Sequence, residues 1–217
     1  MTQRSWAKRL WYAYLRVVCR LAATCFFRIR CNGREHYPAT GGALVLSNHQ
    51  SNLDPVLVGL TCDRRMNFLA RETLFGFAPF RWLIQSLDAI PIDREGLGLS
   101  GLKETLRRAK QGEFILIFPE GTRTPDGELQ PLKPGFSALA KRAGVPLLPI
   151  AIDGAFDAWP RNRKLPRPAT IQIEIGEPIT PDDAKLLDDR ELVEEVQRRL
   201  QACLVVARER RNMRRHS

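Results

Sequence analysis

The chain has 217 residues, a hydrophobic fraction of 44% and a formal net charge of +10, so it is long enough for one domain with a sizeable core. The charge is uneven: residues 1–34 hold eight Lys or Arg and no acid, and residues 190–217 hold eight bases and four acids. Basic ends suit anionic lipid or nucleic acid. The sequence has neither zinc-finger spacing nor an RNP-like strand, so we expect no nucleic-acid partner. Its five cysteines lack paired spacing, so we expect no metal site and no disulfide framework.

Residues 1–31 mix Trp, Tyr and Phe with Arg and Lys. The charge-free runs are far shorter than the roughly 20 residues that span a bilayer, and Arg16 and Arg20 interrupt the apolar part, which excludes a signal peptide. We predict a helical segment that lies in the membrane interface, with aromatic rings at head-group depth and bases facing anionic phosphates. The alternative is an amphipathic helix packed on the protein's own core. Residues 32–217 are predicted to form one α/β domain.

Strands and helices are predicted to alternate along this domain. Expected strands cover residues 27–31, 44–47, 66–70, 87–93, 114–118, 145–152 and 170–175, the last as a one-sided or edge strand. Expected helices cover residues 55–61, 97–110, 134–143 and 188–211, with Gly144 as a stop signal. This alternation predicts a central, mostly parallel sheet flanked by helices.

A polar turn follows the buried strand at residues 44–47. Ser51-x-x-Asp54 has the spacing of a capping box, and Pro55 suits a first helical position. His49 is therefore expected in the turn at the carboxyl end of a strand, where α/β sheets bind ligands, and Asp54 at the start of a helix. The two side chains can meet across this turn, as a general base and the carboxylate that orients it. An ordinary hydrogen-bonded pair is the alternative.

A second polar turn, Phe118-Pro119-Glu120-Gly121-Thr122-Arg123, also follows an apolar run. Together with Asn48-His49-x-x-x-x-Asp54 it resembles the glycerolipid acyltransferase family, and in particular the 1-acylglycerol-3-phosphate (lysophosphatidic acid) acyltransferases. The family's other two blocks match Ile90–Arg94 and Val145–Ile150. All four blocks occur in the family's order, from about Ser47 to Ile150, which is roughly half of the chain.

The resemblance implies a glycerol-3-phosphate acyltransferase-like fold and transfer of a fatty acyl group from a thioester to the free hydroxyl of a lysophospholipid. His49 would take the hydroxyl proton and Asp54 would orient it. The residues expected to bind substrate are Arg94, Glu120, Gly121, Thr122, Arg123 and Lys133. Arg and Lys offer donors that match phosphate oxygens, although surface salt bridges with Asp93, Glu95 or Glu120 are the alternative for the two arginines. Glu120 is expected to position an Arg or a glycerol hydroxyl rather than bind an anion.

Several assignments stay open at this stage. The acceptor could be another lysolipid or glycerol 3-phosphate, and the donor either acyl-CoA or acyl carrier protein, with no further cofactor. The aromatic stretch at residues 75–84 could be a core helix or the wall of an acyl channel, and the basic loop at residues 161–167 would suit either acidic donor. A non-catalytic lipid-binding relative is a rival. So is a serine hydrolase, although Ser47 and Ser51 lie outside a Gly-x-Ser-x-Gly elbow. The expected location is the cytoplasmic face of a membrane, as a peripheral or monotopic enzyme.

Overall fold

The centre of the sheet is formed by strands that are buried on both faces. We describe residues 6–71, 90–92 and 99–215 of a computed structural model. Strand β2 (Ala43–Ser47) lies between β5 (Phe114–Ile117) and β6 (Leu147–Asp153) and is parallel to both. Every residue of the three strands is buried. Successive side chains point to opposite faces of a strand, so continuous apolar runs are needed where helices cover both faces.

Four further strands complete a seven-stranded sheet in the order β1-β7-β6-β2-β5-β3-β4. They are β1 (Arg30–Asn32), β3 (Met66–Arg71), β4 (Ile90–Ile92) and β7 (Gln172–Ile175). Among the strand pairs in the described part of the chain, only β6–β7 is antiparallel, while β1 is parallel to β7. The predicted mostly parallel α/β sheet is therefore confirmed. The carboxyl ends of β2 and β5 lie side by side, which brings the two polar turns together.

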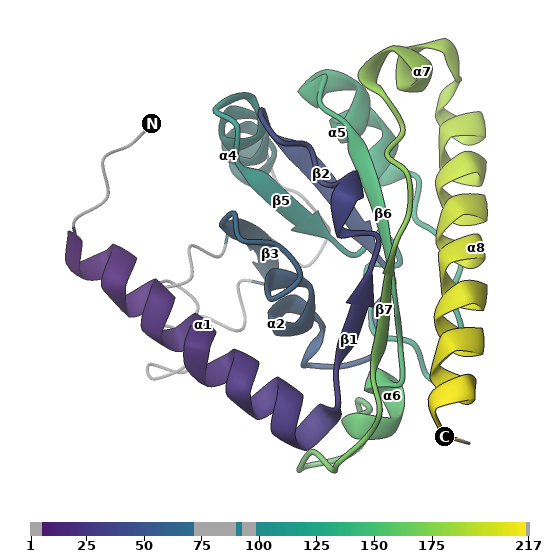
Figure 1. Ribbon diagram of the computed structural model, residues 1–217. Coiled ribbons are helices and arrows are strands. Elements are labelled where there is room, and N and C mark those ends of the chain that lie inside the picture. Colours follow the sequence, from purple (N-terminus) through teal and green to yellow (C-terminus); the bar gives the residue numbers. More distant parts are fainter. Residues whose placement is uncertain (1–5, 72–89, 93–98, 216–217) are drawn as a thin grey trace.

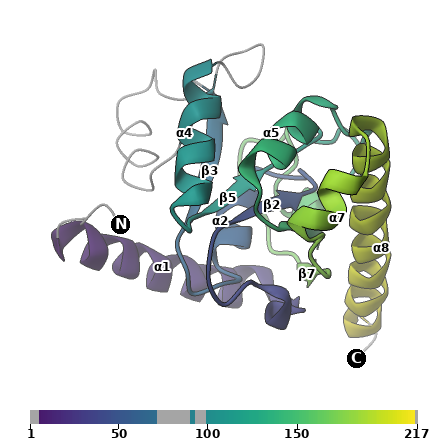
Figure 2. The ribbon, with the colours of Figure 1, turned by 90° about the horizontal axis from the view of Figure 1, so that it is seen from above.

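Helices cover both faces of the sheet (Figures 1 and 2). One face packs against α2 (Asp54–Gly59) and the end of α1 (Trp6–Phe27). The other face packs against α4 (Leu99–Lys110), α5 (Gly135–Ala143) and α8 (Asp189–Arg215). Three short helices lie in connections: a 3₁₀ turn (Arg34–His36), α6 (Ala155–Ala158) and α7 (Pro181–Leu186). Gly144 ends α5 in the left-handed conformation, as predicted.

Helix α1 has two different faces. Ala23 and Phe27 are buried against the domain, and Arg16 forms an ion pair of 2.6 Å with Asp63. The opposite face leaves large apolar side chains exposed, namely Trp6, Leu10, Tyr14, Val17, Val18, Leu21 and Phe26. The two interpretations of this segment thus each describe one side of the helix, because the inner side packs on the core and the outer side has no cover among the described residues.

The described residues include one helix that is long and apolar enough to cross a membrane, judged by length and composition alone. It is the stretch Leu10–Phe27 of α1, of which 11% is buried. From the short charge-free runs, this segment was expected not to span a bilayer. The window of 18 residues meets this criterion although it contains Arg16 and Arg20, and the interfacial position of the segment stays a prediction.

Two sequence predictions about the sheet were wrong. The run that begins at Phe27 was expected to be a strand, but Phe27 ends α1 and the strand begins at Arg30. Strand β7 was expected to be one-sided or an edge, but β1 pairs with its outer side and all of it except the partly buried Glu174 is buried. The prediction failed because alternation along one strand reports burial, and does not report which distant strand pairs with it.

Candidate active site

The turn between β2 and α2 brings His49 and Asp54 together, as the sequence predicted. Asp54 is fully buried, and His49 Nδ1 lies 2.8 Å from its Oδ2. The same oxygen accepts the backbone N–H groups of Gln50 at 2.6 Å and Ser51 at 2.7 Å. Asp54 thereby fixes both the shape of the turn and the direction of the imidazole. The predicted capping box is not formed, because α2 begins at Asp54 itself and its N-cap is Leu53, which has no side-chain cap.

The arrangement selects one tautomer of His49. An ionised carboxylate can only accept, so Nδ1 carries the hydrogen and the lone pair of Nε2 is available to a substrate proton. Burial raises the pKa of the Asp54 carboxyl above its ordinary value, and the hydrogen bond from His49 opposes that rise. The imidazole also stacks on Phe118, with ring centroids 4.0 Å apart. The His49 side chain is 19% exposed, which leaves the imidazole accessible to a substrate.

Glu120 joins the second polar turn to the first. It is 3% exposed, and its Oε1 accepts the backbone N–H of His49 at 2.6 Å while Oε2 accepts that of Gln130 at 2.9 Å. The backbone N–H of Thr124 donates to the carbonyl of His49 at 2.8 Å. Burial raises the pKa of Glu120 to about 7. These contacts give Glu120 a role in positioning the His49 turn, and a direct contact with substrate stays a prediction.

We expect Glu120→Gln to lower the free energy of unfolding at pH 7 by about 1–3 kcal/mol, because the Gln amide cannot accept one of the two backbone N–H groups. The wild-type free energy of unfolding should fall as the pH rises from 4.5 towards 7, since the folded state holds the Glu120 proton more tightly than the unfolded chain. The Glu120→Gln variant should lack this pH-dependent contribution to the free energy of unfolding. Denaturant titrations across that pH range test both points, with exposed Glu177→Gln as the control; equal pH profiles for wild type and Glu120→Gln would contradict the assignment.

The residues expected to bind the acceptor gather beside this turn. Arg123 Nη1 donates to the Asn52 side chain at 2.7 Å, so it bridges the two motifs. Gly121 has φ +72°, and the aliphatic stem of Lys133 lies so close to it that an added Cβ would come within 2.9 Å of that stem. The left-handed conformation favours glycine at this position, and a larger residue would also displace the Lys133 side chain. Thr122 and Lys133 are exposed, which leaves a hydroxyl and an ammonium at the surface of the site.

Two expectations lie outside the described residues. Arg94 follows β4, together with its possible partners Asp93 and Glu95, and the aromatic stretch at residues 75–84 precedes it. The role of Arg94 in substrate binding therefore stays a prediction, and so do both interpretations of the aromatic stretch.

Other residues hold the site together without an obvious sequence signature. The Asn48 side chain brackets Ile152 on β6, accepting its N–H at 2.7 Å and donating to its carbonyl at 2.9 Å. Gln50 is 1% exposed; it donates to the Gly127 carbonyl at 2.8 Å and accepts from Phe156 N–H at 3.2 Å. Asn48 thereby ties the start of the His49 turn to the neighbouring strand. Sequence reasoning missed Gln50 and the stacking partner of His49, because their partners are distant in the chain.

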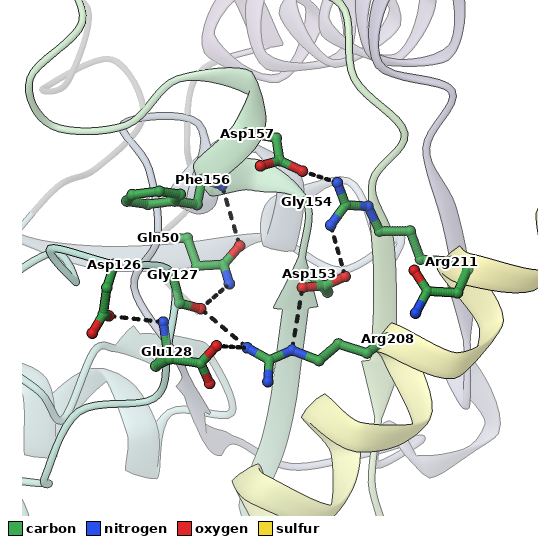
Figure 3. A pocket seen from close by; sticks show the side chains of 11 residues that line it. Gln50, Asp126, Gly127, Glu128, Asp153, Gly154, Phe156, Asp157, Arg208 and Arg211 are labelled. Carbon is green, nitrogen blue, oxygen red and sulfur yellow. Dashed lines mark hydrogen bonds and ion pairs between the residues drawn. The ribbon is translucent and has the colours of Figure 1, made fainter. Parts of the chain in front are cut away.

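Gln50 also borders a polar cavity of about 270 Å³, to which α8 contributes the side chains of Arg208 and Arg211 (Figure 3). Arg208 pairs with Glu128 at 2.8 Å and with Asp153 at 3.6 Å. Arg211, which is 7% exposed, pairs with Asp153 at 2.9 Å and also with Asp157. The last turns of the chain therefore fix the loops that Gln50 contacts.

The two serines of the first motif serve the fold. The Ser51 hydroxyl donates to the Trp159 carbonyl at 2.8 Å and accepts from Leu53 N–H at 3.1 Å. The buried Ser47 hydroxyl donates to the Asn48 carbonyl. Both hydroxyls are thus directed at backbone atoms and not at His49, which disfavours a serine hydrolase.

Comparison with known proteins identifies the family. Residues 28–153 match the family model described as Acyltransferase. The chain is 34% identical over 171 residues to a 1-acyl-sn-glycerol-3-phosphate acyltransferase of Pseudomonas aeruginosa, covering 76% of this chain and 64% of that protein. It is 29% identical over 164 residues to the protein of the same name from Bacillus subtilis, covering 75% and 79%. The matched region thus spans slightly less than two thirds of the Pseudomonas relative.

A solved structure is similar over nearly the whole chain. The crystal structure of the 1-acyl-sn-glycerophosphate (LPA) acyltransferase PlsC from Thermotoga maritima aligns with a TM-score of 0.78 and 26% identity, covering 94% of this chain and 82% of that one. The family model alone covers more than half of the 217 residues and includes both polar turns. The chain belongs to the acyltransferase family.

Proposed function

We propose that the chain transfers a fatty acyl group from an acyl thioester to the free hydroxyl of 1-acylglycerol 3-phosphate, forming phosphatidic acid. The observation that carries the proposal is the 2.8 Å hydrogen bond between His49 Nδ1 and Asp54 Oδ2, which turns Nε2 into a base next to a group of cationic and hydroxyl side chains. The names of the Pseudomonas and Bacillus relatives describe enzymes that act on the same acceptor.

The chemistry needs one base and no covalent enzyme intermediate. His49 Nε2 removes the hydroxyl proton while the hydroxyl oxygen attacks the thioester carbonyl carbon, and Asp54 stabilises the imidazolium that forms. The carbon–sulfur bond of the tetrahedral intermediate then breaks, and the thiolate leaves and takes up the proton that His49 carries. The products are the new ester and a free thiol. Base catalysis of this kind contributes about 10²–10⁴-fold to the rate.

The acceptor phosphate would meet the second turn. Arg123 supplies a planar fork of donors that matches phosphate oxygens, and Lys133 adds a charge held over Gly121. Thr122 offers a hydroxyl to the head group. Arg94 joins this group through the family resemblance. The donor in this proposal is acyl-CoA or acyl carrier protein, either of which supplies an acyl thioester.

The enzyme would act at the cytoplasmic face of a membrane, as a peripheral or monotopic protein. The exposed apolar face of α1 supports this placement, because lipid can cover side chains that the described protein leaves bare. The acidic partner of Arg16 within the domain favours a helix that lies along the surface with its inner side against the protein.

The test is acyl transfer in mixed micelles, with acyl-CoA and acyl carrier protein thioesters supplied in parallel. We expect phosphatidic acid from 1-acylglycerol 3-phosphate. Monoacylglycerol, which has the hydroxyl but lacks the phosphate, should give a kcat/KM about a hundredfold lower, because charge-assisted hydrogen bonds of about 1.5–3 kcal/mol each are lost. Equal rates for the two acceptors would contradict phosphate recognition, and product from glycerol 3-phosphate alone would move the proposal to that acceptor.

A further inference from the structure

The connection between α6 and β7 is strongly basic and carries an apolar tip. Its segment 161–167, here called the basic loop, contains Arg161, Arg163, Lys164 and Arg167, all exposed, and the sequence from Ala158 to Gln172 has no acid. Leu165 lies among these bases and is 74% exposed. A large apolar side chain ringed by cations is the composition of a segment that enters the head-group region of a membrane.

The basic loop is held in shape by its own hydrogen bonds. Arg163 N–H donates to the Pro160 carbonyl at 3.1 Å, and Arg167 N–H donates to the Ala158 carbonyl at 2.9 Å, which closes the base of the loop. The Trp159 indole N–H donates to the Arg163 carbonyl at 3.0 Å. A loop that is already ordered loses little conformational entropy when its tip contacts a surface.

The position of the basic loop links it to the active site and to α1. Trp159, at its start, accepts a hydrogen bond from Ser51 in the His49 turn. Shortly after its end, Ile171 N–H donates to the Phe27 carbonyl at the last residue of α1, at 3.1 Å. Figure 1 shows the connection after α6 and this end of α1 at the same end of the molecule. Phe26, which is 45% exposed, extends the apolar face of α1 to that end.

We infer that the basic loop is a second lipid contact, in which Leu165 enters the interface of an anionic bilayer and the four bases contact lipid phosphates. Together with the outer face of α1, the basic loop would hold the His49 turn at the membrane surface, from which a lipid acceptor arrives. This last point rests on the proposed function. An acidic carrier protein would pair with the basic side chains, but its acidic surface would not bury the exposed Leu165. Continuity with the apolar end of α1 also favours lipid.

The experiment measures binding of the full chain to vesicles by co-sedimentation. Vesicles of phosphatidylcholine with roughly a third phosphatidylglycerol are compared with pure phosphatidylcholine. We expect Lys164→Gln/Leu165→Ser to weaken partitioning into the anionic vesicles about tenfold, since one base and part of one Leu side chain lose their lipid contacts. The matched control is Lys185→Gln/Leu186→Ser, which makes the same change at an exposed Lys-Leu pair on α7, where Leu186 is 84% exposed. The control should bind like the wild type.

Equal partitioning of both double variants would overturn the inference. So would unchanged partitioning of the Lys164/Leu165 variant combined with a loss of activity confined to the acyl carrier protein donor, because that result assigns the loop to a protein partner. Vesicle binding by a His49→Ala variant should match the wild type, so a failure of the proposed chemistry would be seen separately from a failure of the lipid contact.

Discussion

His49→Ala is expected to lower kcat for acyl transfer by about 10²–10⁴-fold while leaving KM for the acceptor nearly unchanged. The change removes the Nε2 lone pair that takes the hydroxyl proton, and it leaves the cationic side chains around Arg123 in place. Steady-state rates of phosphatidic acid formation give both constants. His49→Gln, which keeps most of the side-chain volume, should lose a comparable factor.

A matched control separates chemistry from folding in this experiment. His36 also uses its Nδ1, which lies 2.8 Å from the Ile175 carbonyl, but it sits in the turn that follows β1 and has no part in the proposed chemistry. His36→Ala should retain wild-type kcat within a few-fold. If both His49 variants remain fully active while they unfold at the wild-type temperature, the mechanism proposed here is wrong.

Asp54→Asn is expected to reduce kcat by about 10³–10⁴-fold and to lower the free energy of unfolding by about 1–3 kcal/mol. Asp54 Oδ2 accepts three N–H groups, from His49 Nδ1 and from the backbone of Gln50 and Ser51. The amide oxygen can take the place of Oδ2, but the side chain is then neutral, so it no longer stabilises the imidazolium that forms when His49 takes the proton. The residual rate should come from substrate binding alone.

Kinetics and denaturant unfolding of the same Asp54→Asn sample distinguish the two effects. Asp182→Asn is the matched control, because the Asp182 side chain is 90% exposed and lies on α7. It should change neither quantity. A large loss of stability with normal kcat in the surviving folded fraction would show that Asp54 only shapes the turn and does not stabilise the charge on His49.

The sequence predicted those elements whose signal is local. The runs that became β2, β5 and β6 are apolar at every central position because both faces of each strand are covered, and each run stops at a polar turn. The His49–Asp54 contact was predictable because four intervening residues close one turn. The strand expected from Phe27 failed because a short apolar run at a helix end has no periodicity that distinguishes helix from strand.

The parts of the site that escaped prediction depend on long-range partners. Glu120 bonds to a backbone N–H that lies 71 residues away, and Gln50 to a carbonyl 77 residues away. Phe118 belongs to the second motif, but its stacking on His49 depends on the parallel register of β2 and β5. The types and spacings of residues in a sequence do not determine the order or register of strands in a sheet. These contacts could therefore be identified only from the structure.

The place of β1 in the sheet also has a consequence for the order of events during synthesis. In the described part of the chain β1 pairs only with β7, and Asn32 and Gln172 in these strands are 140 residues apart. At roughly 5–20 residues per second, a ribosome needs about 7–28 s to make that interval. For that time α1 and β1 have left the ribosome while their partner strand does not yet exist. The end of the apolar helix, whose Phe27 carbonyl accepts from Ile171, can therefore reach a bilayer or a chaperone before that partner has been made.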